Sequence, residues 1–300
     1  MQKSSTALQK HLRPWPKTDP RYTESPEEEV ESVRAVTLQD VQSFYQDYYG
    51  ASAVEAAIVG DFDPQEVKAL LTELFQGWES HKPFARLVTP FDDRPVHSEA
   101  IETPDKESAA LQAGLRVKMR DDSSDYPAMV LGNFMVGGGF INSRLATRLR
   151  QKDGLCYGVG SFFNASSFDE DATFGSYAIY APQNAERLMA GYREEIDKAL
   201  REGFAAKEVA EAKQGWLQGR QVSRATDREL ARTLASREYQ ARTLAYDEAL
   251  EKQVGALSSD AISATLKKYL DPAKICTIQA GDFAKAKGKP AETKTSVEAR

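Results

Sequence analysis

The sequence predicts an α+β fold, in which amphipathic helices alternate with strands that pair in antiparallel fashion. Two apolar segments at 159–168 and 173–180 flank the acidic turn 169–171, which is typical of an antiparallel hairpin. Several other segments repeat apolar residues at helical spacing. A third observation, an internal repeat, indicates how the chain divides. Mixed helices and hairpins place the chain in the α+β class.

The composition allows a substantial core and excludes several classes of protein. The chain has 300 residues, 41% of them hydrophobic, enough for one large domain or two small ones. A net charge of −6 and a pI near 5.4 argue against a general nucleic-acid binder. We expect no membrane span, since no long apolar run is present. Two cysteines are too few for a disulfide scaffold, and the three histidines lack zinc-site spacing.

The first part of the chain is predicted to hold two amphipathic helices with a short strand between them. These elements are a helix from Thr37 to Gly50, a strand at 54–59 and a helix at 64–75 opened by Asp63-Pro64. Residues 1–33 carry charges and prolines with no helical or strand period, so we expect a linker or the tail of a preceding unit. Residues 79–107 are polar and proline-rich, a long connection or an edge strand.

The remainder is predicted to alternate strands with helices and to end in a disordered tail. Besides the hairpin, the predicted elements are a strand at 109–117, a helix at 126–136, a helix from Asn184 to Gly203, a charged helix from Ala205 to about Ala241 that breaks near Gly215–Gly219, a helix from Tyr246, a helix from Ser258 to Tyr269 and a strand at 275–280. The last residues are rich in Lys, Ala and Glu, and we expect disorder over 284–300.

Residues 37–62 and 258–283 match one another at a constant offset. Ile262 follows Val41 by 221 positions, and Gly281-Asp282-Phe283 follows Gly60-Asp61-Phe62 by the same interval. Both segments are expected to form a helix, a turn and a buried strand. The match predicts a module of about 220 residues repeated in a longer parent, with residues 34–283 forming one domain as its last repeat.

Residues 132–163 combine a glycine-rich break with a short basic helix and the start of a strand. Leu145 and Leu149 share one face of the basic helix, and Gly154 suits a left-handed cap at its end. Arg150 therefore lies in the last helical turn and Tyr157 at the start of the strand. The short turn between them is expected to bring a guanidinium and a phenol to the same region.

The motif in this segment resembles that of the insulinase/pitrilysin family of zinc metallopeptidases. The pattern Ser143-Arg144-Leu145, then Leu149 to Leu155, then Tyr157, is similar to the family pattern Ser-Arg-Leu-x₃-Leu-Arg-Glu-Lys-x-Gly-Leu-x-Tyr, although Gln151 stands where the pattern has glutamate. The resemblance covers about residues 20–283. It implies a mixed, largely antiparallel sheet with helices packed on one face, as in insulinase and mitochondrial-processing-peptidase-like domains.

The resemblance also implies a function for the parent protein. Family members enclose a chamber between two halves and bind zinc through His-x-x-Glu-His in the first domain. That motif is absent from this chain, so the resemblance implies a C-terminal, non-zinc domain that is inactive alone, holds no cofactor, and needs zinc in a partner half. Peptides or unfolded polypeptides are the implied substrates, and family habit suggests the periplasm.

Arg150 and Tyr157 match an arginine and a tyrosine that the family uses to bind substrate. The resemblance implies that Arg150 holds the substrate backbone and that Tyr157 donates a hydrogen bond to the scissile carbonyl or its oxyanion. Each residue also has an ordinary structural interpretation, as a charge at a helix end and as a residue at a core edge. From spacing alone the structural interpretation is the better supported, and the resemblance reverses that order.

Two other functions stay open at this point. A non-catalytic scaffold or assembly subunit has the same fold, and a peptide-binding module could serve a separate zinc subunit.

The glycines at 137–139 lack the residues of a phosphate loop, so a hinge or close-packing turn is expected. The acidic cluster at 169–171 is expected to be a solvated hairpin tip, and the Cys156 thiol beside Tyr157 a candidate for oxidation.

Overall fold

The computed structural model describes residues 1–286, which fall into two compact units. The first unit comprises residues 1–26, 90–217 and the described residues from 251 onward, and the second comprises 27–89 and 218–250. The predicted division at residues 33 and 283 stays a prediction. Most of the predicted disordered tail, residues 287–300, lies outside the described residues, while Phe283–Ala286 form the short helix α11.

A five-stranded mixed sheet forms the centre of the first unit, in the order β1-β5-β2-β4-β3. Its strands are β1 (Ser98–Glu102), β2 (Ala109–Val117), β3 (Cys156–Ala165), β4 (Ala172–Tyr180) and β5 (Cys276–Gly281). Only β1 and β5 run parallel, and the other three pairings are antiparallel. The predicted α+β class with a largely antiparallel sheet is therefore confirmed, as is the hairpin.

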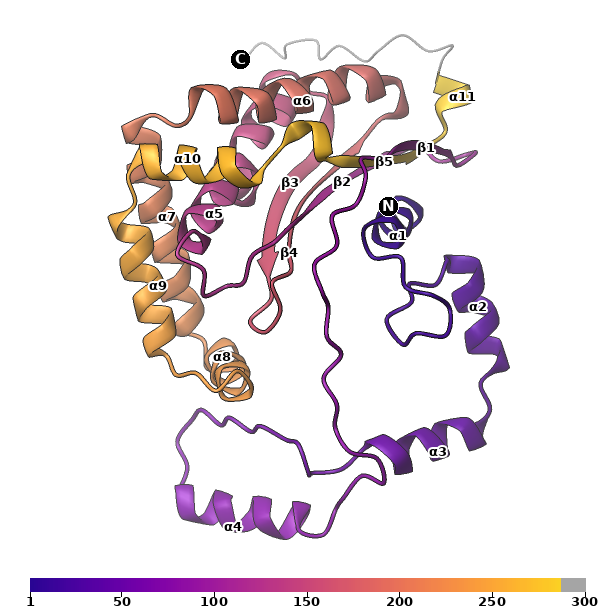
Figure 1. Cartoon of the computed structure of the whole chain (residues 1–300), viewed down its shortest axis with the longest axis vertical. Helices are drawn as coiled ribbons and strands as arrows, with labels where there is room; N and C mark the ends of the chain where they lie inside the picture. The colour runs from indigo at the N-terminus through magenta and orange to yellow at the C-terminus, as the bar shows by residue number, and fades with distance from the viewer. Residues whose placement is uncertain (287–300) are drawn as a thin grey trace, which may run out of the picture. The chain divides into compact units, whose positions relative to one another are not determined.

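Helices cover one face of this sheet, as Figure 1 shows. They are α5 (Tyr126–Asn133), α6 (Ala185–Glu202) and α10 (Ser259–Tyr269), with the short turn η4 (Pro182–Asn184) leading into α6. The apolar spacing that predicted α6 is borne out, because Leu188, Tyr192 and Ile196 are all buried. Gly203 ends α6 with a φ of 69°.

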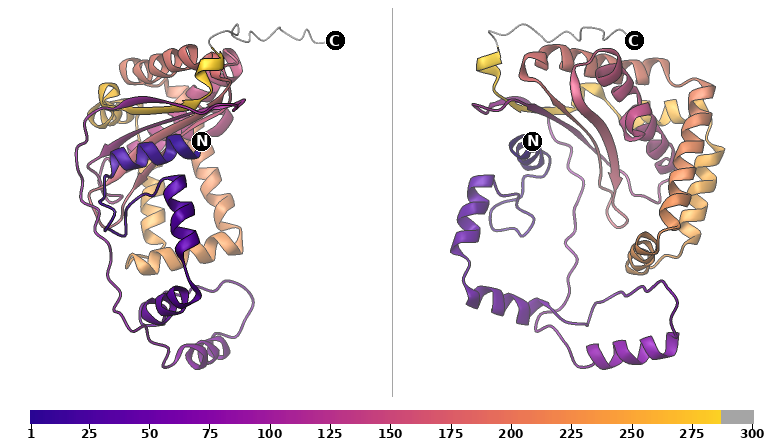
Figure 2. Two further views of the ribbon diagram at one scale, coloured as in Figure 1. Left: turned by 90° about the vertical axis from the view of Figure 1, so that its right-hand side faces the viewer. Right: turned by 180° about the vertical axis from the view of Figure 1, so that it is seen from behind.

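An unpredicted helix, α1 (Gln2–Leu12), covers part of the opposite face, as the edge-on view in Figure 2 shows. Leu8 and Leu12 pack against Cys276 and Ile278 of β5. The expectation that residues 1–33 lack regular structure is wrong, since α2 (Pro26–Ala35) follows α1. The buried stripe of α1 consists of Ser4, Leu8 and Leu12, too few apolar residues to give a clear helical period.

The charged segment after residue 205 forms two helices, but its break lies elsewhere than predicted. α7 (Ala206–Arg224) passes through both Gly215 and Gly219, and α8 (Asp227–Tyr239) begins after a turn at Ala225–Thr226. A glycine inside an exposed helix costs only about 1 kcal/mol relative to alanine, which is too little to end a long helix. No helix within residues 1–286 has the length and apolar character of a membrane span.

Within the second unit, Asp247 of α9 (Ala245–Ala256) joins this helix to Arg237 of α8 and to Arg220 of α7. The carboxylate of Asp247 is buried and accepts hydrogen bonds from Arg237 at 2.7 and 2.8 Å and from Arg220. Burial acts to raise the pKa of Asp247, but the hydrogen bonds from the two arginines outweigh it and lower that pKa. The three helices are thus linked through one buried carboxylate.

The two repeated segments form matching helices but only one strand. α3 (Leu38–Tyr48) and α10 have the same length and register, and their caps Thr37 and Ser258 both accept a hydrogen bond from the backbone. Residues 276–281 form β5 between β1 and β2, whereas the predicted strand at 54–59 is wrong, because this segment is irregular. It pairs with no strand of the described residues. The predicted helix at 64–75 is confirmed as α4 (Pro64–Phe75).

Asp171 ties the hairpin to β2 and to the end of α1. Its carboxylate accepts hydrogen bonds from Arg116 at 2.8 and 3.0 Å and from Arg13 at 2.8 Å. The side chains of Asp171 and Arg116 are each only 4% exposed. The expectation of a solvated hairpin tip is therefore wrong for Asp171, although the neighbouring Glu170 is exposed.

We predict that Asp171→Ala lowers the free energy of unfolding by about 3 kcal/mol, because it leaves the Arg116 guanidinium buried without its counter-charge. Chemical denaturation of the purified chain measures the change. Glu170→Ala, in the same turn, is the matched control and should change stability by less than about 0.5 kcal/mol. Equal effects of the two substitutions would show that the buried pair does not hold the hairpin.

Candidate functional site

The helix that carries Arg150 is a π-helix, η3 (Ala146–Lys152), anchored by two leucines. Leu145 and Leu149 are fully buried, as their shared face predicted. Asp153 donates its backbone N–H to the carbonyl of Arg148 five residues earlier, at 3.0 Å. The wide turn and the leucine anchors fix the backbone at Arg150 while leaving its side chain exposed.

Gly154 ends this helix in the left-handed conformation that the sequence predicts. Its φ is 63°, and Leu155 donates its backbone N–H to the carbonyl of Leu149 at 2.8 Å. A side chain at position 154 would be strained at this φ. The chain then turns directly into β3, so the cap determines where Tyr157 enters the sheet.

Tyr157 occupies a β-bulge at the start of β3. Cys156 pairs with Tyr180 and Gly158 pairs with Ile179, so Tyr157 is the extra residue between two paired ones. Its side chain is 62% exposed. A bulge re-aims a side chain away from the regular alternation of a strand. The phenol is thereby presented to solvent at one edge of the sheet.

Arg150 differs from the two other arginines of the motif in having no partner. Arg144 donates to both oxygens of Glu208 at 2.8 Å and to the carbonyl of Gly203 at 2.8 Å. Arg148 is paired with Asp153 and with Glu194, each at 2.9 Å. Within the described residues, the guanidinium of Arg150 makes no hydrogen bond or ion pair. Its charge therefore forms no polar contact that would stabilise the described part of the fold.

The positive charge of Arg150 acts on the residue beside Tyr157. Burial raises the pKa of the Cys156 thiol to about 11, against a smaller lowering by Arg150. Arg150 is thus close enough to the start of β3 to influence the electrostatics at Cys156. The expectation that Cys156 is oxidation-prone is not supported, since a buried thiol with a raised pKa is a poor thiolate source.

The residues around the motif are used for packing. Gln151 donates its side-chain amide to the carbonyl of Ile141 at 2.6 Å, beside the turn η2 (Phe140–Asn142). A β-carbon at Gly137, in the π-helix η1 (Phe134–Gly138), would lie 2.5 Å from the hydroxyl of Ser161. The glycine-rich segment is therefore a close-packing turn, one of the two structures expected for it.

The described residues contain no group of three or more histidine, cysteine, aspartate or glutamate side chains placed to hold a metal ion. His11 and His97, two of the three histidines, stack with ring centroids 4.9 Å apart. A zinc ion therefore does not fit the residues that the structure describes.

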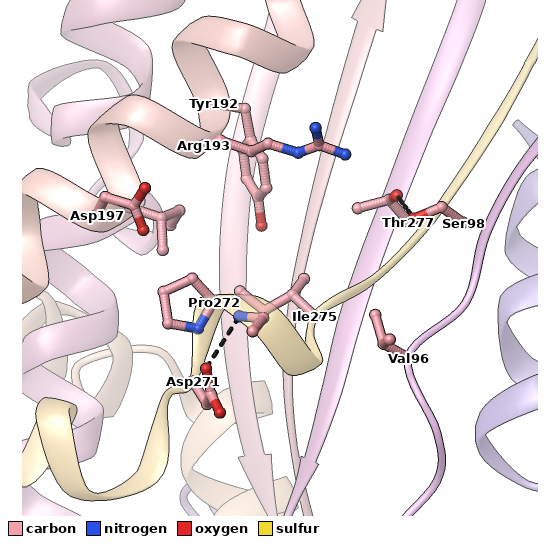
Figure 3. Close-up of a pocket in the computed structure, with 11 residues that line it drawn as sticks. Val96, Ser98, Tyr192, Arg193, Asp197, Asp271, Pro272, Ile275 and Thr277 are labelled. Carbon is pink, nitrogen blue, oxygen red and sulfur yellow. Dashed lines mark hydrogen bonds between the residues drawn. The ribbon is translucent and has the colours of Figure 1, made fainter.

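The structure also contains a pocket that the sequence did not indicate (Figure 3). Its volume is about 540 Å³, and neither Arg150 nor Tyr157 lines it. Its walls come from α6, from the turn η5 (Pro272–Lys274) before β5, and from the edge strand β1. Tyr192 and Ile196 belong to the apolar stripe of α6, but a pocket between segments so distant in sequence leaves no local pattern.

Comparison with known proteins identifies the family that these elements match. The model of the family described as the peptidase M16 inactive domain matches residues 35–215. An uncharacterized zinc protease of Streptomyces coelicolor is 29% identical over 198 residues, which are 64% of this chain and 42% of that protein. A protein of Helicobacter pylori named as a non-peptidase homolog is 23% identical over 80% of this chain and 55% of its own length.

The solved structures agree on the fold. A peptidase M16 inactive domain from Pseudomonas fluorescens superposes with a TM-score of 0.75 at 22% identity, over 93% of this chain and 64% of that one. A conserved protein from Enterococcus faecalis superposes with a TM-score of 0.71 at 15% identity, over 93% and 63%. The chain spans about half the length of the curated relatives named above.

We predict that Arg150 contributes nothing to folding and that Arg144 does. Arg144→Gln breaks the two hydrogen bonds to Glu208 and should lower the free energy of unfolding by about 1–2 kcal/mol. Arg150→Gln should change it by less than about 0.5 kcal/mol. Denaturation curves of the two variants measure the difference, and a comparable loss at Arg150 would mean that its charge is structural.

We predict that neither thiol reacts at pH 8 in the folded chain. Burial raises the pKa of Cys156 to about 11 and also raises the pKa of Cys276, so the thiolate of each forms at a higher pH than that of an exposed cysteine. Since a raised folded pKa favours the neutral form, stability from these groups is complete below pH 9 and lost above it. A chromogenic disulfide reagent should label both thiols in denaturant and neither beforehand. Rapid labelling of the folded chain at pH 8 would contradict this.

Proposed function

This chain belongs to the peptidase M16 inactive-domain family, and from that membership we propose that it is the non-zinc, C-terminal domain of a zinc metallopeptidase, with Arg150 and Tyr157 as its substrate-binding pair. The parent cleaves peptides or unfolded polypeptides within a closed chamber. Zinc belongs to a partner half, on the same chain or on a separate subunit.

The observation that carries this proposal is the contrast among the three arginines of one motif. Arg144 and Arg148 are held by Glu208 and by Asp153 and Glu194, whereas Arg150 is exposed without a partner. An unpaired guanidinium and, seven residues later, a phenol exposed by a bulge support a role toward a ligand. Neither side chain makes a hydrogen bond or an ion pair within the described residues.

The two side chains suit different parts of one substrate. The guanidinium of Arg150 presents a planar fork of N–H donors, which can bind backbone carbonyls of an extended peptide. The Tyr157 hydroxyl can donate a hydrogen bond to the scissile carbonyl, where negative charge grows as that carbonyl is attacked. Arg150 would therefore act mainly on substrate affinity and Tyr157 on the chemical step.

A non-catalytic scaffold is the second candidate function. The names of two relatives favour it: the Helicobacter pylori non-peptidase homolog, and a Bacillus subtilis protein named as a probable inactive metalloprotease that is 27% identical over 44% of this chain. An unpaired Arg150 favours the peptidase, because a scaffold has no use for it. The peptide-cleavage experiment below separates the two.

We predict that Tyr157→Phe lowers kcat about a hundredfold when this chain is assembled with its zinc-bearing half, because one donor to the reacting oxygen is lost. Arg150→Gln should instead raise KM, with a smaller effect on kcat. Hydrolysis of a quenched fluorescent peptide measures both constants.

The matched controls for this experiment are Tyr49→Phe, which removes an exposed hydroxyl elsewhere, and Lys152→Gln, which removes another exposed charge of the same helix. Both should leave cleavage unchanged. An assembled, active complex that is indifferent to Tyr157→Phe would refute the assignment of Tyr157, and an assembled complex without any cleavage would favour the scaffold.

A further inference from the structure

The pocket beside β1 has the size and shape of a small-molecule site. Its volume of about 540 Å³ lies within the range of roughly 300–1,000 Å³ that ligand pockets occupy. Four of its lining side chains are buried, and they give it a largely apolar floor: Tyr192, Ile196, Ile275 and Thr277. An apolar group of a ligand would therefore be stabilised at its base.

The polar groups of the floor are already satisfied within the protein. The Tyr192 hydroxyl shares a hydrogen bond of 2.7 Å with Ser176, and burial raises the pKa of Tyr192 to about 12, so it stays neutral. The hydroxyls of Ser98 and Thr277 are hydrogen-bonded to each other at 2.9 Å across β1 and β5. Because these polar groups already have partners, the floor does not need a charged group from a ligand.

The charged side chains lie around the mouth. Arg193 and Asp197 are exposed on α6, and neither makes a hydrogen bond or an ion pair with any described residue. They are four residues apart on one helix, a spacing that ordinarily favours an ion pair. Figure 3 shows why they remain apart: Arg193 extends toward Thr277, and Asp197 lies on the other side of Tyr192.

Asp271 adds a second carboxylate on the side opposite Arg193 (Figure 3). One of its oxygens accepts the backbone N–H of Ala273 at 2.9 Å, which fixes the carboxylate at the rim. The mouth therefore has a cationic side at Arg193 and an anionic side at Asp197 and Asp271, with apolar surface beneath.

We propose that this pocket binds a short zwitterionic peptide of two or three residues, with its carboxylate on Arg193, its ammonium group toward Asp197 and Asp271, and an apolar side chain on the floor. A guanidinium binds a carboxylate through two parallel hydrogen bonds. The separation of the charges favours a peptide over a free amino acid, whose charged groups are adjacent. The choice of a peptide over other zwitterions rests on the proposed function.

Calorimetric titration of the whole chain with the dipeptide Leu-Leu tests the proposal. Saturable binding is expected, and Leu-Leu amide and N-acetyl-Leu-Leu, which each lack one charge, should bind at least about tenfold more weakly. Arg193→Gln should weaken Leu-Leu about tenfold yet leave the affinity for the amide unchanged. Asp197→Asn should likewise weaken the binding of Leu-Leu about tenfold, and it should leave the affinity for N-acetyl-Leu-Leu unchanged.

Arg187→Gln is the matched control, because Arg187 is exposed on the same helix but does not line the pocket. It should bind Leu-Leu like the unchanged chain. Ala273→Trp, a substitution at an exposed position of the rim, should abolish binding by filling the mouth. Absence of saturable binding, or an equal loss with Arg187→Gln, would overturn the proposal.

The same titration separates this proposal from the proposed catalytic role. It needs no zinc-bearing half, and Tyr157→Phe should bind Leu-Leu with unchanged affinity. If Leu-Leu binds while Tyr157→Phe leaves cleavage intact, only the catalytic assignment fails. If Tyr157→Phe impairs cleavage while Leu-Leu does not bind, only the pocket assignment fails.

Discussion

Backbone pairing of β5 between β1 and β2 is the interaction on which the rest of the first unit depends. It joins residues 276–281 to strands more than 150 positions earlier in the chain and satisfies the hydrogen bonds of β5 on both sides. It also provides the surface on which Leu8 and Leu12 of α1 pack. The irregular segment 54–59 carries the same pattern of residues, and within the described residues it has no such neighbours. A strand is therefore decided by its partners more than by its own sequence.

The candidate site lies at the edge of this sheet that is formed by β3. β3 lies at the end of the strand order, where the bulge at Tyr157 can turn a side chain outward without disturbing a second neighbour. Just before it, Leu145 and Leu149 hold the π-helix against the core, and the Gly154 cap sets the turn between helix and strand. Rigid elements thus position two exposed side chains that make no hydrogen bond or ion pair within the described residues. Side chains that are held in place by rigid elements are typical of binding sites.

Helices with strong caps and apolar stripes could be predicted from the sequence, because their determinants are local. The bounds of α3, α4 and α10 follow from Thr37, Asp63-Pro64 and Ser258. The features that were missed depend on distant segments. Asp171 was predicted to be a solvated turn residue, because Arg116 and Arg13, which pair with it, are distant in sequence. Helix α1 was missed because its apolar stripe is too short to give a clear helical period. The motif located Arg150 and Tyr157, but only the structure distinguishes the unpaired arginine from the paired ones.

A crystal structure of this chain assembled with its zinc-bearing half and a non-cleavable peptide analogue would show directly whether Arg150 and Tyr157 bind substrate. We expect the Tyr157 hydroxyl to lie within about 3 Å of the carbonyl oxygen at the scissile position, and the Arg150 guanidinium to contact backbone oxygens of the same peptide. A peptide bound in the chamber with both side chains still facing solvent would contradict it.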